Sequence, residues 1–220
     1  MIIAARLWSA VTVLAAVLAV SIELLLVIMG LAAVTDDDVP PLGIRLWRFV
    51  SFFTIQSNLL VIITVLPLIM APAHSGRRWR VLRLDGLVMI TVTGLVHWFL
   101  LRPLSTLTGW SAVADSLLHI VVPLLAVVGW LVFGPRPRIT STTVAWSLLW
   151  PIAWLVYTFV VGGLTGWYPY PFLDAGVHSV EQVALTCGAV AVLFTGLASA
   201  CWRLDAALGR RPTGLRRVRS

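Results

Sequence analysis

The sequence has no lysine, only two cysteines and few charged residues of any kind. Charged side chains make up 11% of its 220 residues, whereas hydrophobic residues make up 60% and the mean hydropathy is +0.97. This composition excludes an ordinary soluble domain. Cys187 and Cys201 lie in one apolar run. On a helix they would be about 21 Å apart, at about 1.5 Å per residue, which excludes a disulfide between them.

Motifs of several common functional classes are also missing. The chain has no internal repeat, no glycine-rich phosphate loop and no metal-ligand spacing of useful specificity, so we expect no metal and no organic cofactor. The net charge of +7 is compatible with nucleic-acid binding. The arginines, however, cluster in short loops and at the C-terminus, beside the ends of apolar runs, which is typical of a membrane protein. We therefore expect no nucleic-acid partner.

Six apolar runs are long enough to cross a bilayer, which takes about 20 residues per helix. The sequence therefore predicts an all-α, polytopic integral membrane protein. Its six-helix transmembrane bundle would occupy residues 1–202, and a basic cytoplasmic tail residues 203–220. The first run resembles a signal sequence, but it is too long for an ordinary signal core and is expected to be retained. The expected spans are 8–34, 46–70, 84–101, 111–133, 142–161 and 174–202.

The distribution of arginine predicts the orientation of this bundle. Arginines fill the loops between spans two and three and between spans four and five, and they follow span six. The opposite loops carry Asp36, Asp37, Asp38 and Asp174 with fewer arginines. The positive-inside rule then places both termini in the cytoplasm of a multi-pass protein of the inner (plasma) membrane. We expect the basic tail to contact anionic lipid.

The second span combines an apolar run with a polar face. In FVSFFTIQSNLLVIITVL, residues 49–66, Thr54, Ser57 and Asn58 stand at i, i+3 and i+4, so a helix places them on one face. Polar side chains at that depth in a bilayer are costly unless they find partners or perform a function. Such a face can also simply hold helices together by hydrogen bonds.

Polar side chains from five of the expected spans fall at a similar depth, in the outer half of the bilayer. We placed each of them by counting about 1.5 Å of rise per residue from the nearest helix end. Their shared depth predicts that they converge on one pocket inside the bundle. The set consists of Glu23, Thr54, Ser57, Asn58, His97, Asp115, His119, His178, Glu181 and Gln182.

Thr54 and His119 are the expected catalytic pair within this layer. A threonine hydroxyl is a poor nucleophile until a base takes its proton, and histidine is the usual base. Asp115 precedes His119 by one helical turn and could orient its imidazole ring. Ser57, Asn58 or a freed backbone N–H group could stabilise an oxyanion.

The loop between the last two spans contains the segment YPYPF, residues 168–172. Its two prolines prevent a regular helix, and its aromatic side chains favour the headgroup zone of the membrane. Tyr168, Tyr170 and Phe172 could form a lid over the polar layer, and a rigid interfacial loop is the alternative.

Three segments resemble the signatures of a group of small six-span bacterial (actinobacterial-type) membrane proteins of unassigned role. They are FFTIQSNLL at 52–60, LLHIVVPLL at 117–125 and GWYPYPFLD at 166–174. That group is distantly similar to the eukaryotic androgen-induced membrane hydrolases, which cleave fatty acid esters of hydroxy fatty acids with a threonine and a histidine. The resemblance implies that Thr54 is the nucleophile and His119 the histidine. SNLL and YPYPF depart from the eukaryotic pattern.

The leading hypothesis is an intramembrane hydrolase of a lipid ester that enters sideways from the outer leaflet. Membrane lipid would then be both the environment and the substrate. One alternative is a small-molecule or proton-coupled transporter, in which Glu23, His97, His119, His178 and Glu181 form a binding or relay set. Another is a non-catalytic, lipid-binding scaffold whose polar layer only ties the helices together.

Overall fold

The structure, a computed structural model, describes residues 1–31, 39–104 and 106–209. Within these ranges the chain forms helices and no strand. Six helical runs in the described chain are long and apolar enough to cross a membrane, which confirms the predicted all-α, six-helix class. They are Ile2–Met29, Phe53–Met70, Arg77–Leu101, Gly109–Phe133, Ser141–Thr165 and Val180–Gly209.

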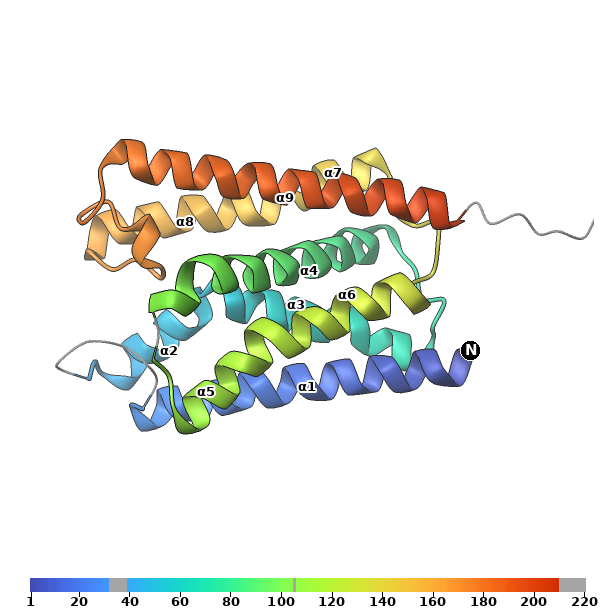
Figure 1. The fold of residues 1–220 in the computed structure, drawn as a ribbon, viewed down its shortest axis with the longest axis horizontal. Helices are drawn as coiled ribbons and strands as arrows, with labels where there is room; N and C mark the ends of the chain where they lie inside the picture. The colour runs from blue at the N-terminus through green and yellow to red at the C-terminus, as the bar shows by residue number, and fades with distance from the viewer. Residues whose placement is uncertain (32–38, 105, 210–220) are drawn as a thin grey trace, which may run out of the picture.

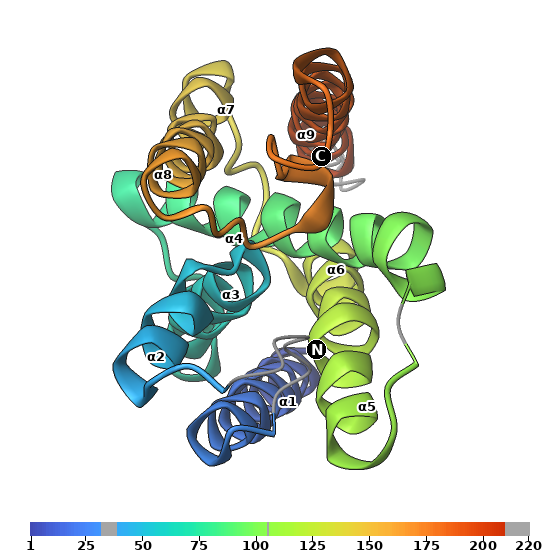
Figure 2. The ribbon, with the colours of Figure 1, turned by 90° about the vertical axis from the view of Figure 1, so that its left-hand side faces the viewer.

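Four helices form a ring around the main core. α1 (Ile2–Met29), α3 (Phe53–Met70), α4 (Arg77–Val96) and α6 (Val122–Phe133) each pack against two others of the set. Figure 2 shows this ring from one end of the bundle. Apolar side chains at helical spacing on each member face inward and exclude water. The central cluster consists of Val13, Ala16, Val61, Val65, Ile90, Val122 and Ala126.

α4 is buried on two sides because further helices cover its face away from the ring. These helices are α7 (Ser141–Ser147), α8 (Leu149–Thr165) and α9 (Val180–Gly209), as Figures 1 and 2 show. This second layer explains why α4 is apolar almost all round beyond Asp85. The cluster between the layers consists of Leu60, Leu84, Val88, Met89, Val92, Phe194 and Ala198.

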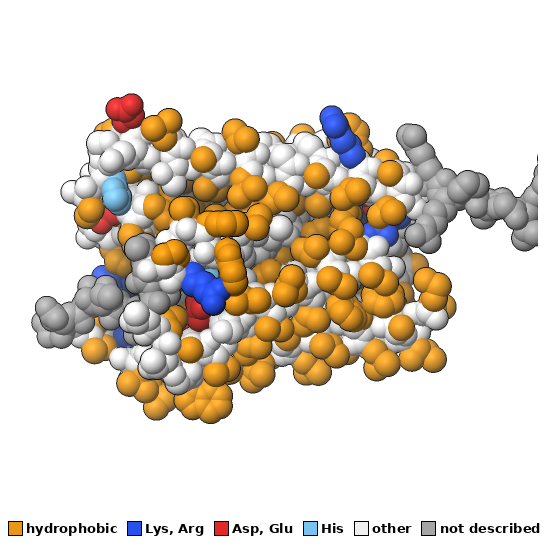
Figure 3. All heavy atoms as spheres, in the orientation of Figure 1, with side chains coloured by type: hydrophobic (Ala, Val, Ile, Leu, Met, Phe, Trp, Pro, Cys, Tyr) orange, Lys and Arg blue, Asp and Glu red, His pale blue; other side chains and the backbone are white. Residues whose placement is uncertain are grey.

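The flanks of the bundle are apolar. Leu14, Leu124 and Val156 are 68%, 60% and 58% exposed, respectively. Figure 3 shows hydrophobic side chains over most of the visible face between the two ends. A surface of this kind is unfavourable in water and suits lipid chains. It fits the multi-pass membrane protein that the six apolar runs indicate.

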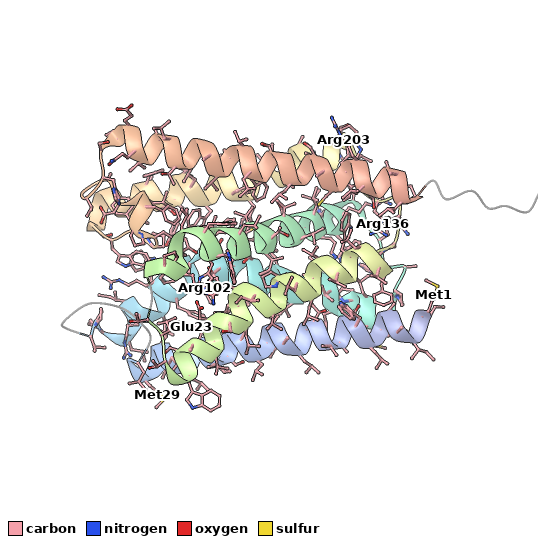
Figure 4. The ribbon with its side chains drawn as sticks, in the orientation of Figure 1. Met1, Glu23, Met29, Arg102, Arg136 and Arg203 are labelled. Carbon is pink, nitrogen blue, oxygen red and sulfur yellow. The ribbon has the colours of Figure 1, made fainter. Side chains whose placement is uncertain are left out.

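Both ends of the described chain lie at the same end of the bundle. Figure 1 places the N-terminus and the end of α9 together there, and Figure 4 shows Met1, Arg136 and Arg203 at this end and Met29 at the other. We call these the terminal end and the site end. Both ends of the described chain lie together because the six helical runs traverse the bundle an even number of times.

Asp205 fixes α9 to the loop between α6 and α7 at the terminal end. This carboxylate is fully buried and accepts hydrogen bonds from the backbone N–H groups of Arg138 (2.5 Å) and Ile139 (2.8 Å). The basic composition predicted that a tail begins at Arg203. α9 instead continues to Gly209. The rest of the predicted tail lies outside the described residues.

The second expected span, 46–70, is two helices. A single residue, Phe52, separates α2 (Leu42–Ser51) from α3. Its backbone is extended, with φ −65° and ψ 128°. No proline or glycine marks the break, so residue type alone did not reveal it. The first span begins at Ile2, ahead of Trp8, and its expected end at 32–34 lies outside the described residues.

The sixth expected span begins later than predicted. Residues after Tyr170 form a short 3₁₀ turn, η4 (Pro171–Leu173), and α9 starts only at Val180. Ser179 and Gln182 exchange hydrogen bonds across the first turn of α9, with Ser179 N donating to Gln182 Oε1 (3.1 Å) and Gln182 N donating to Ser179 Oγ (3.2 Å). This capping box fixes the start of the helix after Asp174 and His178.

Candidate active site

The break at Phe52 frees backbone groups, and side chains from other positions satisfy them. Trp154 Nε1 donates to the carbonyl of Ser51 at 2.9 Å, and Gln56 Nε2 donates to the carbonyl of Val50 at 3.1 Å. Unpaired backbone groups are costly in an apolar environment. These two bonds therefore stabilise the break that makes Thr54 part of the first turn of α3.

Thr54 is buried at the start of α3, where backbone N–H groups have no acceptor within the helix. Its own N–H donates to the hydroxyl of Tyr170 at 3.1 Å, and the two hydroxyl groups are also 3.1 Å apart. Thr54 also contacts His119, whose Nε2 lies 3.2 Å from Thr54 Oγ1. The residues expected to form the catalytic pair are thus within hydrogen-bond distance.

Two acceptors on the other ring nitrogen determine the tautomer of His119. Its Nδ1 lies 2.9 Å from Asp115 Oδ1 and 3.1 Å from the backbone oxygen of Asp115. Both partners are acceptors, so the proton of a neutral ring belongs on Nδ1 and the lone pair on Nε2. His119 therefore directs a basic nitrogen at the Thr54 hydroxyl. The i, i+4 spacing expected from the sequence brings the carboxylate to the ring.

Both histidines of the site lie in π-helical turns. His97 begins η1 (His97–Leu101), which leads into the 3₁₀ turn η2 (Arg102–Leu104). His119 is the middle residue of η3 (Leu117–Val121), which joins α5 (Gly109–Ser116) to α6. π-helical turns are rare and occur often at functional sites. They rotate the two imidazole rings relative to a regular helix, and sequence periodicity does not reveal this rotation.

His97 completes the polar cluster from α4. Its ring stacks on the ring of His119, with centroids 4.0 Å apart and planes at 15°. Its Nε2 lies 3.2 Å from Asp115 Oδ2, so one carboxylate faces both imidazoles. The expected convergence of α4 and the α5–η3 segment on one site is thus present in the structure.

Ser57 and Asn58 lie beside the site but do not face into it. Ser57 Oγ donates to the Thr54 carbonyl at 2.9 Å, and Asn58 Nδ2 donates to the same oxygen at 2.8 Å. Asn58 Nδ2 is also 3.4 Å from the carbonyl of Leu118. In a π-helical turn this carbonyl would accept from the N–H group of residue 123, but residue 123 is a proline and has none. Both side chains bind backbone oxygens, so their expected role as oxyanion donors does not fit. The freed N–H group of Thr54 fits it better.

The YPYPF loop enters the site through Tyr170. The phenol is buried against Thr54, and burial raises the pKa of Tyr170 above its usual value, while the hydrogen bonds with Thr54 act in the opposite direction. Phe172 stacks on its ring at 5.4 Å. Tyr168 instead packs on Phe159, and a Cβ atom at Gly162 would overlap its ring. Of the three aromatic residues expected in a lid, Tyr170 and Phe172 therefore lie beside Thr54, and Tyr168 does not.

Three residues of the predicted layer lie elsewhere. Glu181 and Gln182 are exposed at the start of α9, and His178 precedes that helix, so the expected i, i+3, i+4 face does not exist. None of the three lines a cavity that contains Thr54. The height of a residue along its helix does not determine which side of the bundle it faces. α9 lies in the second layer, behind α4.

Glu23 borders a cavity of about 290 Å³ that opens the site toward the site end of the bundle. Thr54, Asp115 and His119 also line it, together with Pro169 and other residues of the loop above. Figure 4 shows Glu23 on α1, at the level of Arg102 at the end of α4. Glu23 is therefore part of the polar cavity, as predicted from its depth.

A second cavity of about 200 Å³ meets the first at Thr54, Leu101 and Tyr170. It runs between α3, α4, α8 and α9, and its walls are almost entirely apolar. Cys187, which the sequence left without a role, lines it. The other lining residues include Val92, Val96, Pro151, Leu155, Val190 and Phe194. Thr54 thus stands between a cavity with charged side chains in its wall, which we call the polar cavity, and a cavity that is almost entirely apolar.

Comparison of the chain with protein-family models, with curated proteins and with solved structures finds no match in any of the three. The function has to be inferred from the geometry of the site.

Proposed function

We propose that this protein is an integral membrane hydrolase that cleaves a lipid ester, with Thr54 as nucleophile and His119 as base. The observation that carries the proposal is the alignment of three groups: Thr54 Oγ1 lies 3.2 Å from His119 Nε2, and His119 Nδ1 lies 2.9 Å from Asp115 Oδ1. Nucleophile, base and orienting carboxylate in this order define the serine-hydrolase type of site. The resemblance to the androgen-induced hydrolases points to the same pair.

The reaction would proceed in two halves. Thr54 Oγ1 attacks the ester carbonyl carbon while its proton passes to His119 Nε2. The tetrahedral intermediate then expels the alcohol, which takes the proton from His119, and leaves an acyl group on Thr54. Water, deprotonated by the same nitrogen, attacks the acyl group, and the carboxylic acid leaves as the threonine hydroxyl is restored.

Tyr170 is placed to stabilise the negative charge that develops on the carbonyl oxygen. Its hydroxyl accepts from Thr54 N and so has its own proton to donate, in the resting enzyme toward Thr54 Oγ1. When Thr54 Oγ1 becomes the acylated oxygen, that proton is free for the oxyanion, and the N–H group of Thr54, which donates to the same hydroxyl in the resting enzyme, is the backbone donor beside it. A helix N-terminus adds positive potential at the same point.

The two cavities suggest how a lipid ester would bind. A fatty acyl chain fits the apolar cavity between α4, α8 and α9, and the polar part of the substrate fits the cavity that contains Glu23 and Asp115. The scissile carbonyl then lies at Thr54, where the cavities meet. Their combined size is in the range of about 300–1,000 Å³ that small-molecule sites usually have.

The arginine distribution supports an orientation in which the terminal end faces the cytoplasm and the site end the outer leaflet. Arg136 and Arg203 are among the arginines at the terminal end. Substrate would then enter sideways from the outer leaflet of the plasma membrane. A transporter needs a polar path to the other side, whereas the core toward the terminal end of this site is the apolar cluster around Val61 and Ile90. This favours hydrolysis over transport.

The test is covalent labelling of the purified, detergent-solubilised protein with a fluorophosphonate probe, together with mass-spectrometric assay of lipid ester hydrolysis. We expect labelling of the wild type, its loss in Thr54→Ala and its partial retention in Thr54→Ser. Thr64→Ala is a matched control, because Thr64 is a buried threonine on the same helix whose hydroxyl bonds only to the Leu60 carbonyl. Labelling that persists in Thr54→Ala would eliminate Thr54 as the nucleophile.

A further inference from the structure

His97 is a buried group that the proposed reaction does not use. Its side chain is 4% exposed, and Nε2 lies 3.2 Å from Asp115 Oδ2 without the angles of a hydrogen bond. The proton transfer described above needs only Thr54, His119 and Asp115. A buried imidazole nitrogen without a hydrogen bond is costly unless it has a ligand to bind.

His97, Asp115 and His119 together offer one donor atom each, and these three atoms lie within 4.8 Å of one another. Zinc binds histidine nitrogen and carboxylate oxygen at about 2.0–2.2 Å, so neighbouring ligand atoms around one ion are about 3–3.5 Å apart. The carboxylate oxygens of Asp115 lie 2.9 Å and 3.2 Å from the two nitrogens. An imidazole binds a metal ion in its ring plane, so rotation of one ring out of the stack, with Asp115 kept between the two nitrogens, would place all three atoms around one ion.

We propose that His97, Asp115 and His119 bind a divalent transition-metal ion, for which Zn²⁺ is the best fit, and that the bound ion inhibits the site. Two imidazoles and one carboxylate suit zinc and its neighbours in the first transition row, whereas Mg²⁺ and Ca²⁺ prefer oxygen ligands throughout. Asp115 and His119 line the polar cavity with Glu23, so an ion can reach them from the site end. Two carboxylates there attract cations.

The inhibition follows from the two nitrogens of His119. A metal ion on Nδ1 uses the lone pair of that atom, so the proton of the neutral ring moves to Nε2. Nε2 then donates to Thr54 Oγ1 instead of accepting its proton, and Thr54 loses its base. This consequence depends on the proposed hydrolase mechanism, whereas metal binding itself does not.

Metal binding can be measured without any enzymatic activity. The full-length protein in detergent is stripped with chelator and titrated with Co²⁺, whose visible absorption reports coordination by nitrogen and oxygen, and bound Zn²⁺ is counted after equilibrium dialysis. We expect about one ion per chain. In His97→Ala the affinity should fall by at least about 100-fold, because second-shell changes alone cost about 10–100-fold.

His178→Ala is the matched control, because His178 lies at the same end of the bundle but outside the cluster. It should bind Co²⁺ like the wild type. His119→Ala gives a second measurement, and thermal unfolding without metal establishes that each variant is folded. Equal affinity of the wild type and a folded His97→Ala, or no binding by the wild type, would overturn the proposed metal site.

The inhibitory role is tested by the ratio of probe labelling with chelator to labelling with Zn²⁺. We expect a ratio well above ten for the wild type and a ratio close to one for His97→Ala, whatever its absolute rate. Labelling that Zn²⁺ leaves unchanged or increases would overturn inhibition. Co²⁺ binding without labelling of the metal-free protein would reject the hydrolase and keep the metal site. Labelling of Thr54 without Co²⁺ binding would reject the metal site and keep the hydrolase.

Discussion

Tyr170→Phe removes one hydroxyl group at the point where the two cavities meet and leaves the aromatic packing in place. The ring keeps its contacts with Phe52 and Phe172, while Thr54 N loses its acceptor and Thr54 Oγ1 loses a donor, each at 3.1 Å. A buried N–H group left unpaired costs about 1–3 kcal/mol. We therefore expect the free energy of unfolding to fall by about 2 kcal/mol.

The same substitution should slow the reaction by more than it destabilises the fold. Loss of a single oxyanion donor typically costs about 10²–10³-fold in the rate constant. Because the N–H group of Thr54 loses its acceptor and remains as a donor beside the oxyanion, we expect the lower value, about 10²-fold. The assays are ester hydrolysis by mass spectrometry and thermal unfolding in detergent. Tyr168→Phe is the control, since this tyrosine of the same loop packs on Phe159, away from Thr54. If both variants have the same rate and stability, the role given to Tyr170 is refuted.

The raised pKa of Tyr170 also makes a prediction about pH. Because the folded protein holds this proton more tightly than the unfolded chain, stability from this group is complete below pH about 10 and is lost as pH rises through the pKa of the folded state. Tyr170→Phe should remove that part of the alkaline destabilisation, and Tyr168→Phe should not. Unfolding curves between neutral pH and pH about 11 measure the difference.

Three further substitutions test other parts of the structure. Asp115→Asn should slow ester hydrolysis by about 10²–10³-fold, less than the largest losses seen for triad carboxylates, because its backbone oxygen still orients the imidazole. Gly94→Ala would place a Cβ atom 3.0 Å from the carbonyl oxygen of the proposed base and should reduce hydrolysis, whereas Gly188→Ala, with open space around it, should leave hydrolysis unchanged. Asp205→Ala should lower the free energy of unfolding in detergent by about 3 kcal/mol, because two backbone N–H groups lose their acceptor. Glu181 is exposed at the other end of α9, so Glu181→Ala should lower it by less than about 0.5 kcal/mol.

The parts of the site that depend on short-range geometry could be predicted from the sequence. Hydropathy and helical rise gave the six apolar runs and the shared depth of Thr54, His97 and His119. The i, i+4 spacing gave the contact between Asp115 and His119. These predictions succeeded because a helix fixes the distance between neighbours on one face and the height of every residue along its axis.

Features that depend on packing order or on irregular backbone could not be predicted in the same way. Depth alone placed His178 and Glu181 in the layer, yet α9 lies behind α4, with Glu181 in its first turn and His178 just before it. The break at Phe52 has no proline or glycine to mark it, and its stabilising partner Trp154 is about a hundred positions away in the chain. Tyr170 was expected to cover the site, and its contact with Thr54 depends on how the whole loop folds back.

Irregular backbone around Thr54 explains why so many polar side chains lie at this level of the bundle. A membrane-spanning helix tolerates a break only if other groups satisfy the freed N–H and C=O groups. Trp154 satisfies the carbonyl of Ser51, Asn58 that of Leu118, and Tyr170 the N–H of Thr54. Because the partners are protein side chains, the N–H group of Thr54 and the hydroxyl of Tyr170 are held at the site in a medium of low polarity. Fixed dipoles stabilise a developing oxyanion most strongly in such a medium, so the residues that make the break possible also create the conditions for the proposed chemistry.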